Sequence, residues 1–283
     1  MALESRVEAP DTALLTLIGY GSLSLLAAGL MQLANLNSTL FIAINHSSAA
    51  YAPDAVFAAI TMFGEGLWQM ALIAPLLLVA PRVNVAALYA APVALLVTHV
   101  PKLFFHMPRP SSVLAHHGVH LIDAPMAMNT FPSGHAVMAG MIATVVILGF
   151  EVVRRRMWVA LLVLSLSWLV SWSRIAVGAH WPADVLVGAA LGVAAGWAGN
   201  ELAERFYRPS GRATLIVAGI YVAGAIALAF TRTHHPQEEL LRVILVVTGL
   251  ASALAAIVRA QIAGATRHSS RTKAESQARA FTT

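Results

Sequence analysis

Residues 157–199 read MWVALLVLSLSWLVSWSRIAVGAHWPADVLVGAALGVAAGWAG, and this stretch decides the class of fold. It contains two apolar runs, near 157–177 and 184–202, and each has about the 20 residues that a helix needs to cross a bilayer. The segment that joins them, SRIAVGAHWPAD at 173–184, carries an arginine, a histidine and an aspartate. Charge is costly at the centre of a bilayer, so these side chains belong at an interface or in a functional site. The stretch predicts two transmembrane helices joined by a polar turn.

The composition of the whole chain indicates the same class. Of the 283 residues, 58% are hydrophobic and 11% are charged, whereas about 25% are charged in an average soluble domain. The chain has no cysteine, which excludes disulfides and thiolate metal sites. Its net charge of +5 is compatible with nucleic-acid binding, but the basic residues follow a membrane pattern instead, so no nucleic-acid partner is expected.

Eight apolar runs predict an all-α fold, a polytopic membrane helix bundle. They lie near 13–34, 65–81, 83–103, 135–153, 157–177, 184–202, 213–231 and 241–262. The second run is short. Residues 54–64 either extend it or form a helix that lies in the membrane interface, and we favour the interfacial helix.

Lysine and arginine concentrate on the cytoplasmic side of membrane proteins. With the N-terminus inside, thirteen of the eighteen basic residues fall on the cytoplasmic side. The five on the opposite side are Lys102, Arg109, Arg174, Arg232 and Arg242. We therefore expect both termini in the cytoplasm.

Apart from Arg232 and Arg242, the outer charge lies in three segments at the ends of spans. They are KLFFHMPRP at 102–110, FPSGHA at 131–136 and SRIAVGAHWPAD at 173–184. All three face the same compartment in this topology, so the helix bundle can bring them together.

The second and third of these segments begin helices. Ser133 is a favourable N-cap, followed by Gly134 and His135, and the unpaired N–H groups at such a helix start bind anions. Asp184 follows His180 by four positions, where its carboxylate can accept a hydrogen bond from one imidazole nitrogen and leave the other as a nucleophile. Each feature alone is also typical of an ordinary helix cap.

Together the segments supply two histidines, a carboxylate, three cations and free backbone amides. Phosphoryl transfer needs such a set, because negative charge spreads over three oxygens that guanidinium and ammonium groups can hold. A phosphate substrate also explains why Lys102, Arg109 and Arg174 lie on the side that is otherwise poor in positive charge.

The spacing of these residues resembles all three signature motifs of the type 2 phosphatidic acid phosphatase superfamily of membrane lipid phosphatases. The first motif is KxxxxxxRP at 102–110, the second is PSGH at 132–135, and the third is SRxxxxxHxxxD at 173–184. The resemblance covers residues 54–200, and the three spacings together are highly specific.

This resemblance implies a metal-independent mechanism through a phosphohistidine, with no cofactor. It implies that His180 attacks phosphorus, that Asp184 orients His180, and that His135 protonates the leaving oxygen. It implies that the phosphate oxygens are bound by Lys102, Arg109, Ser133, Gly134 and Arg174. The loop at 106–131 contains several histidines and Asp123, but their spacing matches no standard zinc site, and no metal is expected.

The family usually has six spans, so we expect a phosphatase core at 1–207 and two additional spans at 208–263. We interpret the additional spans as packing on the core or forming an oligomer contact. The polar, basic segment at 264–283 predicts a disordered cytoplasmic tail.

The resemblance implies a membrane lipid that carries a phosphate or diphosphate, hydrolysed at the outer, periplasmic face of a bacterial inner membrane. We favour undecaprenyl diphosphate, converted to undecaprenyl phosphate. The alternatives are a phosphatidylglycerophosphate or phosphatidic acid phosphatase, a lipid A phosphatase and a lipid phosphotransferase. A transporter is the remote alternative, because it predicts charge in the middle of spans rather than at their ends. The sequence carries no signal of oligomeric state.

Overall fold

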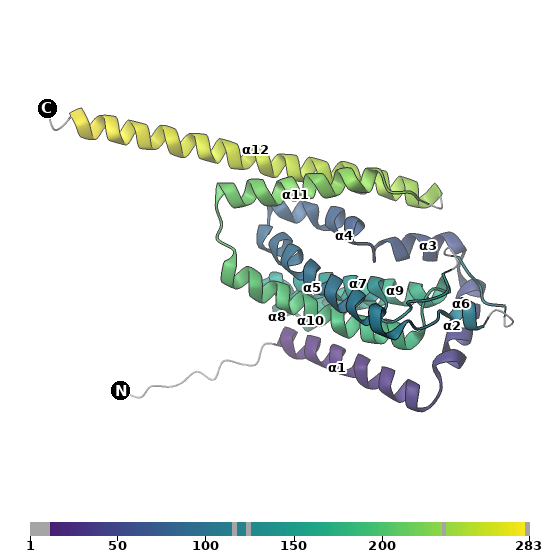
Figure 1. Ribbon diagram of the computed structural model, residues 1–283. Coiled ribbons are helices and arrows are strands. Elements are labelled where there is room, and N and C mark those ends of the chain that lie inside the picture. Colours follow the sequence, from purple (N-terminus) through teal and green to yellow (C-terminus); the bar gives the residue numbers. More distant parts are fainter. Residues whose placement is uncertain (1–11, 115–117, 123–125, 234–235, 281–283) are drawn as a thin grey trace, which may run out of the picture. The chain divides into compact units, whose positions relative to one another are not determined.

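The structure, a computed structural model, describes residues 12–114, 118–122, 126–233 and 236–280, and within these ranges it contains helices and no strand (Figure 1). The predicted all-α, polytopic class is confirmed. In chain order the elements are α1 (Thr12–Leu33), α2 (Asn37–Tyr51), α3 (Asp54–Met62), α4 (Gly66–Ile73), the 3-10 helix η1 (Ala74–Leu78), α5 (Pro81–Phe105), α6 (Pro110–Val113), α7 (Gly134–Gly149), α8 (Glu151–Arg155), α9 (Met157–Ala176), α10 (Pro182–Phe206), α11 (Gly211–Ala229) and α12 (Pro236–Ala280).

Six helices in the described ranges are long and apolar enough to cross a membrane, and they agree with six of the eight predicted runs. The run at 135–153 becomes α7, which has 16 residues and is shorter than a usual span. The run at 65–81 is not one continuous α-helix, because α4 changes to the 3-10 geometry of η1 after Ile73. Counted with α3 as one broken span, this run raises the number of candidate spans to seven.

The sequence did not indicate α2, because polar residues interrupt its apolar pattern. One of them, Asn45, is fully buried. Its side-chain amide donates to the carbonyl oxygens of Ile175 and Ala176 at 3.3 and 2.9 Å. Phe41, on the same helix, packs edge-on against the ring of Trp181, with centroids 5.4 Å apart. Helix α2 therefore supports the end of α9 and the loop that carries the third motif.

The chain divides into two compact units, and the first contains all three motifs. It comprises the residues up to Glu65 and those from Ala86 to Leu202. Within this unit, α10 lies directly against the backbone of α7. A Cβ atom on Gly192 would lie 2.3 Å from the carbonyl oxygen of Val137, and one on Gly188 would lie 2.6 Å from that of Ser133. Small residues spaced by four allow transmembrane helices to approach this closely, and the contact places the second motif beside the third.

The close contact between α7 and α10 predicts a large effect of a single methyl group. The Gly192→Ala variant is expected to lose roughly 1–3 kcal/mol of stability, because its Cβ meets backbone atoms that cannot move aside. The measurement is the melting temperature of the purified protein in detergent. Gly19→Ala in α1 is the matched control, since a Cβ there meets nothing within 4 Å. Equal melting temperatures for the two variants would show that α7 and α10 do not pack at this distance.

The second unit comprises Gly66–Val85 and the residues from Ala203 onward. Here α11 and α12 pack along each other, and both contact α4 (Figure 1). The side-chain amide of Asn84 donates to the carbonyl oxygen of Ile73 at 2.9 Å and closes the turn between η1 and α5. The sequence placed a boundary near residue 207, whereas in the structure the segment at 66–85 groups with the last two helices. Apolar runs along the chain carry no information on which distant helix they will contact.

Helix α12 continues to Ala280 and so includes most of the segment at 264–283 for which disorder was predicted. The low hydrophobicity of this segment led to that prediction. Its sequence nevertheless contains four Ala, three Arg and one each of Glu, Gln and Lys, which all have high helix propensity. The structure therefore differs from the expectation in secondary structure.

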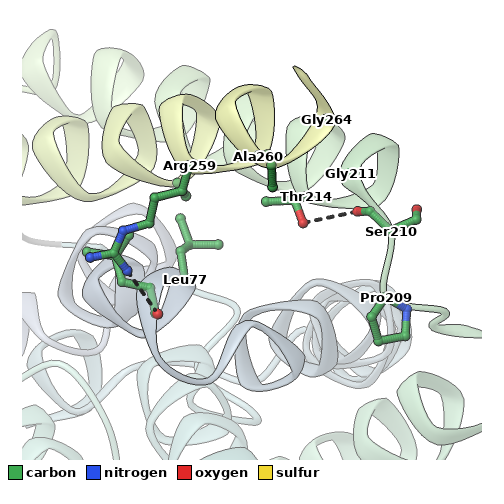
Figure 2. A pocket seen from close by; sticks show the side chains of 11 residues that line it. Leu77, Pro209, Ser210, Gly211, Thr214, Arg259, Ala260 and Gly264 are labelled. Carbon is green, nitrogen blue, oxygen red and sulfur yellow. Dashed lines mark hydrogen bonds between the residues drawn. The ribbon is translucent and has the colours of Figure 1, made fainter. Parts of the chain in front are cut away.

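The second unit also contains a cavity of about 430 Å³ between η1, the start of α11 and α12 (Figure 2). At one side, Arg259 donates to the carbonyl oxygen of Leu78 at 3.4 Å. At the other side, the hydroxyl of Thr214 donates to the carbonyl oxygen of Ser210 at 3.1 Å. No residue of the three motifs lines this cavity, so it is not the candidate active site.

Candidate active site

The residues of the three motifs lie at helix ends in the first unit. From the first motif, Lys102 is in the last turn of α5 and Arg109 precedes α6. The second motif, with Ser133, Gly134 and His135, begins α7. From the third motif, Arg174 is in the last turn of α9, His180 is in the following loop, and Asp184 is in the first turn of α10. Around His180, the groups close enough to influence its charge are Arg174, Arg109, Lys102 and His135. The structure thus brings the residues predicted from three separate segments into one site.

The loop of the third motif has a fixed shape that depends on Gly178. This glycine has a φ of +82°, and a Cβ there would lie 2.7 Å from a backbone oxygen, so a larger residue does not fit. Arg109 donates to the carbonyl oxygen of Ala179 at 3.2 Å, and the indole N–H of Trp181 donates to that of Pro108 at 3.0 Å. The first and third motifs therefore hold each other in place on both sides of His180.

The direct hydrogen bond expected between His180 and Asp184 is absent, because Nδ1 and Oδ2 are 3.7 Å apart. The side chain of Thr130 contacts both groups instead. Its Oγ1 donates to Oδ2 of Asp184 at 2.5 Å and lies 3.2 Å from Nδ1 of His180. The same carboxylate oxygen accepts the backbone N–H of Trp181 at 3.0 Å. Nothing in the sequence pattern singled out Thr130.

His180 is 3% exposed, and its environment favours the neutral imidazole. Burial lowers the pKa of His180 well below its ordinary value of 6.5, and the positive charges of Arg174, Arg109 and Lys102 lower this pKa further. A neutral imidazole has a free lone pair on one ring nitrogen. His180 therefore suits a nucleophile at neutral pH.

Two arginines are buried in the site. Arg109 is 6% exposed and also donates through Nε to the carbonyl oxygen of Met128 at 3.2 Å. Arg174 is 3% exposed and donates to the hydroxyl of Thr61 at 2.5 Å. Guanidinium groups match the oxygens of a phosphate in geometry and charge. With the half-buried Lys102 beside them, they make a site suited to a phosphate.

Ser133 occupies the N-cap position of α7, but the predicted capping hydrogen bond from its side chain is absent. Its Oγ is buried and has no hydrogen-bond partner among the described residues. Its backbone N–H donates to the carbonyl oxygen of Asp184 at 3.1 Å. A buried hydroxyl that lacks a partner needs a physical reason, and a bound phosphate oxygen would supply one.

His135 is held by two residues that lie outside the three motifs, Gly64 and Glu65. Its Nε2 lies 3.1 Å from a carboxylate oxygen of Glu65. A Cβ on Gly64 would lie 2.6 Å from Cδ2 of the His135 ring, so only glycine allows the chain to pass so close. A protonated His135 would form an ion pair with Glu65, which suits the role of proton donor predicted for it.

Within the described residues, no group of three or more His, Asp or Glu side chains is arranged to hold a metal ion. Of the histidine-rich loop, His120 pairs instead with Asp54, at 2.8 Å. His116, His117 and Asp123 lie outside the described residues.

Residues 83–208, which include all three motifs, match the family model of the PAP2 superfamily. This part of the chain is therefore similar to the PAP2 superfamily. Among solved structures, LpxE of Aquifex aeolicus is 29% identical, with a TM-score of 0.52 over 59% of this chain and 95% of that one. The PAP2-type phosphatidylglycerolphosphate phosphatase of Bacillus subtilis is 19% identical, with a TM-score of 0.48 over 68% of this chain and 98% of that one. No curated protein in the comparison matches significantly.

The PAP2 match begins at residue 83, so several contacts to the site come from outside it. They are made by Asn45 on α2, by Thr61 on α3 and by Glu65 just after α3. The segments that precede the match, α2, α3 and the residues just after α3, therefore contact residues of the second and third motifs.

The lowered pKa of His180 predicts an unusual pH dependence for a reaction in which it is the nucleophile. The imidazole stays neutral as the pH falls through 6.5 and becomes protonated only well below it. The rate of phosphoenzyme formation is therefore expected to hold through that range and to fall at lower pH. The measurement is single-turnover formation of the acid-labile phosphoenzyme from about pH 4.5 to 8, corrected for the separately titrated substrate. A midpoint at 6.5 or above would contradict the neutral, buried nucleophile.

Proposed function

We propose that this PAP2 protein is a metal-independent membrane lipid phosphatase that forms a phosphohistidine at His180. The observation that carries this proposal is the buried His180 beside Lys102, Arg109 and Arg174, where burial and these charges lower its pKa and favour the neutral imidazole. A nucleophile with a free lone pair next to three cations suits attack on a phosphate better than attack on an uncharged carbonyl. The membrane helices around the site support a lipid as the carrier of that phosphate.

In the first step, Nε2 of His180 forms a bond to phosphorus. The bond from phosphorus to the leaving oxygen breaks, and its electron pair stays on that oxygen, which takes a proton from His135. The transferred phosphoryl oxygens lie against the side chains of Lys102, Arg109 and Arg174. The hydroxyl of Ser133 and the N–H of Gly134 complete the set of donors.

In the second step, water attacks the phosphorus of the phosphohistidine. His135, which lost its proton in the first step, now accepts one from the water. The bond between nitrogen and phosphorus breaks, and its electron pair returns to Nε2 of His180. Inorganic phosphate leaves, and both histidines are restored to their starting states.

Undecaprenyl diphosphate is the favoured substrate, and undecaprenyl phosphate is the product. The motifs lie at helix ends, so a long chain can remain in the hydrocarbon region while the diphosphate enters the site at the interface. The excess of basic residues on the opposite loops supports cytoplasmic termini and a site that faces the periplasm of a bacterial inner membrane.

Release of inorganic phosphate by the purified protein in detergent tests this function. EDTA is present throughout, and the substrates are undecaprenyl diphosphate, phosphatidylglycerophosphate, phosphatidic acid and lipid A. The expected result is release that EDTA does not reduce, fastest with undecaprenyl diphosphate. Faster release from another of the four lipids would reassign the substrate and keep the reaction.

A radiolabelled phosphate group separates hydrolysis from transfer. Label recovered on a second lipid, with little inorganic phosphate, would make the protein a phosphotransferase. A folded protein that forms neither product from any of the four lipids would contradict the proposed function.

A further inference from the structure

The hydroxyl of Thr130 lies beside the His180 and Asp184 side chains, within hydrogen-bond distance of both. All three side chains are buried, with Thr130 fully so and the other two 3% exposed. Oγ1 of Thr130 lies 2.5 Å from Oδ2 of Asp184 and 3.2 Å from Nδ1 of His180. The two outer groups are 3.7 Å apart, which is too long for a hydrogen bond.

The number of protons on these three side chains determines which group donates and which accepts each hydrogen bond. A threonine hydroxyl has one proton to donate and lone pairs that accept. The 2.5 Å contact with Asp184 is typical of an O–H donated to a carboxylate. The proton of Thr130 is therefore committed to Asp184, and the hydroxyl oxygen can only accept from His180.

This arrangement fixes the tautomer of the nucleophile. Because Oγ1 accepts, Nδ1 of His180 must carry the proton, and the lone pair must then lie on Nε2. The same N–H remains bonded after phosphorylation of Nε2, when the ring carries a positive charge. The carboxylate of Asp184 acts on the ring through the hydroxyl, and its bond from the N–H of Trp181 at 3.0 Å holds it in place.

We propose that Thr130 is a positioning residue for catalysis, which holds His180 in the reactive tautomer and transmits the effect of Asp184. This inference rests on the proposed phosphohistidine mechanism. A purely structural role is the competing interpretation, because the backbone N–H of Thr130 also donates to the carbonyl oxygen of Met107 at 3.1 Å and ties two loops together. The backbone bond survives a side-chain substitution, so the two roles can be separated.

The test compares Thr130→Val with Thr130→Ser in the full chain, in detergent with EDTA. Valine keeps the shape and removes the hydroxyl, whereas serine keeps the hydroxyl. Thr130→Val is expected to slow phosphoenzyme formation and kcat by about 10²-fold, the size of effect typical when a partner that orients a functional histidine is lost. KM should change little, because the Thr130 hydroxyl is bonded to His180 and Asp184 and is not among the residues proposed to bind the phosphate. Thr130→Ser should stay within about threefold of the unmodified protein, since it keeps the hydrogen bond.

A matched control and a combined variant complete the design. Thr144→Val removes an equally buried hydroxyl, which bonds to the carbonyl oxygen of Gly140 within α7, and should leave kcat unchanged. Adding Thr130→Val to Asp184→Asn should cost little beyond Asp184→Asn alone, because both substitutions break the same connection.

Three outcomes would overturn the inference. Thr130→Val could form the phosphoenzyme at the unmodified rate, or Thr130→Val and Thr130→Ser could lose kcat and melting temperature equally, which would make the role structural. The third outcome is an unmodified protein that releases no phosphate, in which case the proposed function fails and the inference fails with it. The first two outcomes leave the proposed function intact, so the two failures are distinguishable.

Discussion

The His180→Ala variant is expected to lose at least ~10⁴-fold in kcat, because removal of a nucleophile leaves only the rate that binding and electrostatic contacts provide. The His180 side chain is buried, and its hydrogen bond is to the Thr130 side chain. Its removal should leave the packing between the helices intact, so the fold should survive. The measurements are inorganic phosphate release in the presence of EDTA and recovery of labelled phosphoenzyme after rapid quenching. No labelled protein should be recovered from the variant.

His46→Ala is the matched control, since His46 is an exposed histidine on α2 that contacts the carbonyl oxygen of Gly118 at 3.2 Å. It should keep full activity. His180→Gln removes the nucleophile while it retains a polar side chain of similar length, and it should be as inactive as His180→Ala. If either His180 variant formed a phosphoenzyme at the normal rate, the mechanism through His180 would be wrong.

The sequence predicted the helices that depend on hydrophobicity alone. The apolar runs at 157–177 and 184–202 became α9 and α10 almost unchanged, because a run of this length has few other stable states in a membrane. Helix α2 was missed for the opposite reason. Asn45 can be buried there only because carbonyl groups far along the chain accept its hydrogen bonds. A prediction from the local sequence pattern does not include these distant partners.

The same distinction applies to the site. His180 and Asp184 could be found from the sequence because their residue types are scarce in apolar segments and their spacing is informative. Thr130, Thr61 and Glu65 could not be found, because each has its role only through a contact made across the fold. A threonine or a glutamate at a span end is too common to carry a prediction alone. The residues proposed to react could therefore be found from the sequence, whereas the residues that contact them could be found only in the structure.

The Arg174→Ala variant is expected to lose about 10³-fold in kcat/KM, because a guanidinium that stabilises the charge on a transferred phosphoryl group contributes on this scale. Arg174→Lys should recover only part of the loss, since an ammonium group cannot form two parallel hydrogen bonds to a phosphate. Thr61→Val should cost about tenfold, since the guanidinium and its charge remain and only the hydrogen bond that orients it is lost. The measurement is kcat/KM for phosphate release, with the melting temperature recorded for each variant.

Vanadate inhibition distinguishes a role in the transition state from a role in folding. Vanadate adopts the five-coordinate geometry of the transition state. Loss of a residue that binds the transition state should therefore lower kcat/KM and weaken vanadate binding to the same extent. Arg174→Ala should therefore weaken vanadate inhibition by about the same factor as it lowers kcat/KM. Arg232→Ala removes an exposed arginine that lies outside the motifs and should change neither value. A loss of kcat/KM without weaker vanadate inhibition, or with a large fall in melting temperature, would assign Arg174 to the structure of the site and leave the phosphate to Lys102 and Arg109.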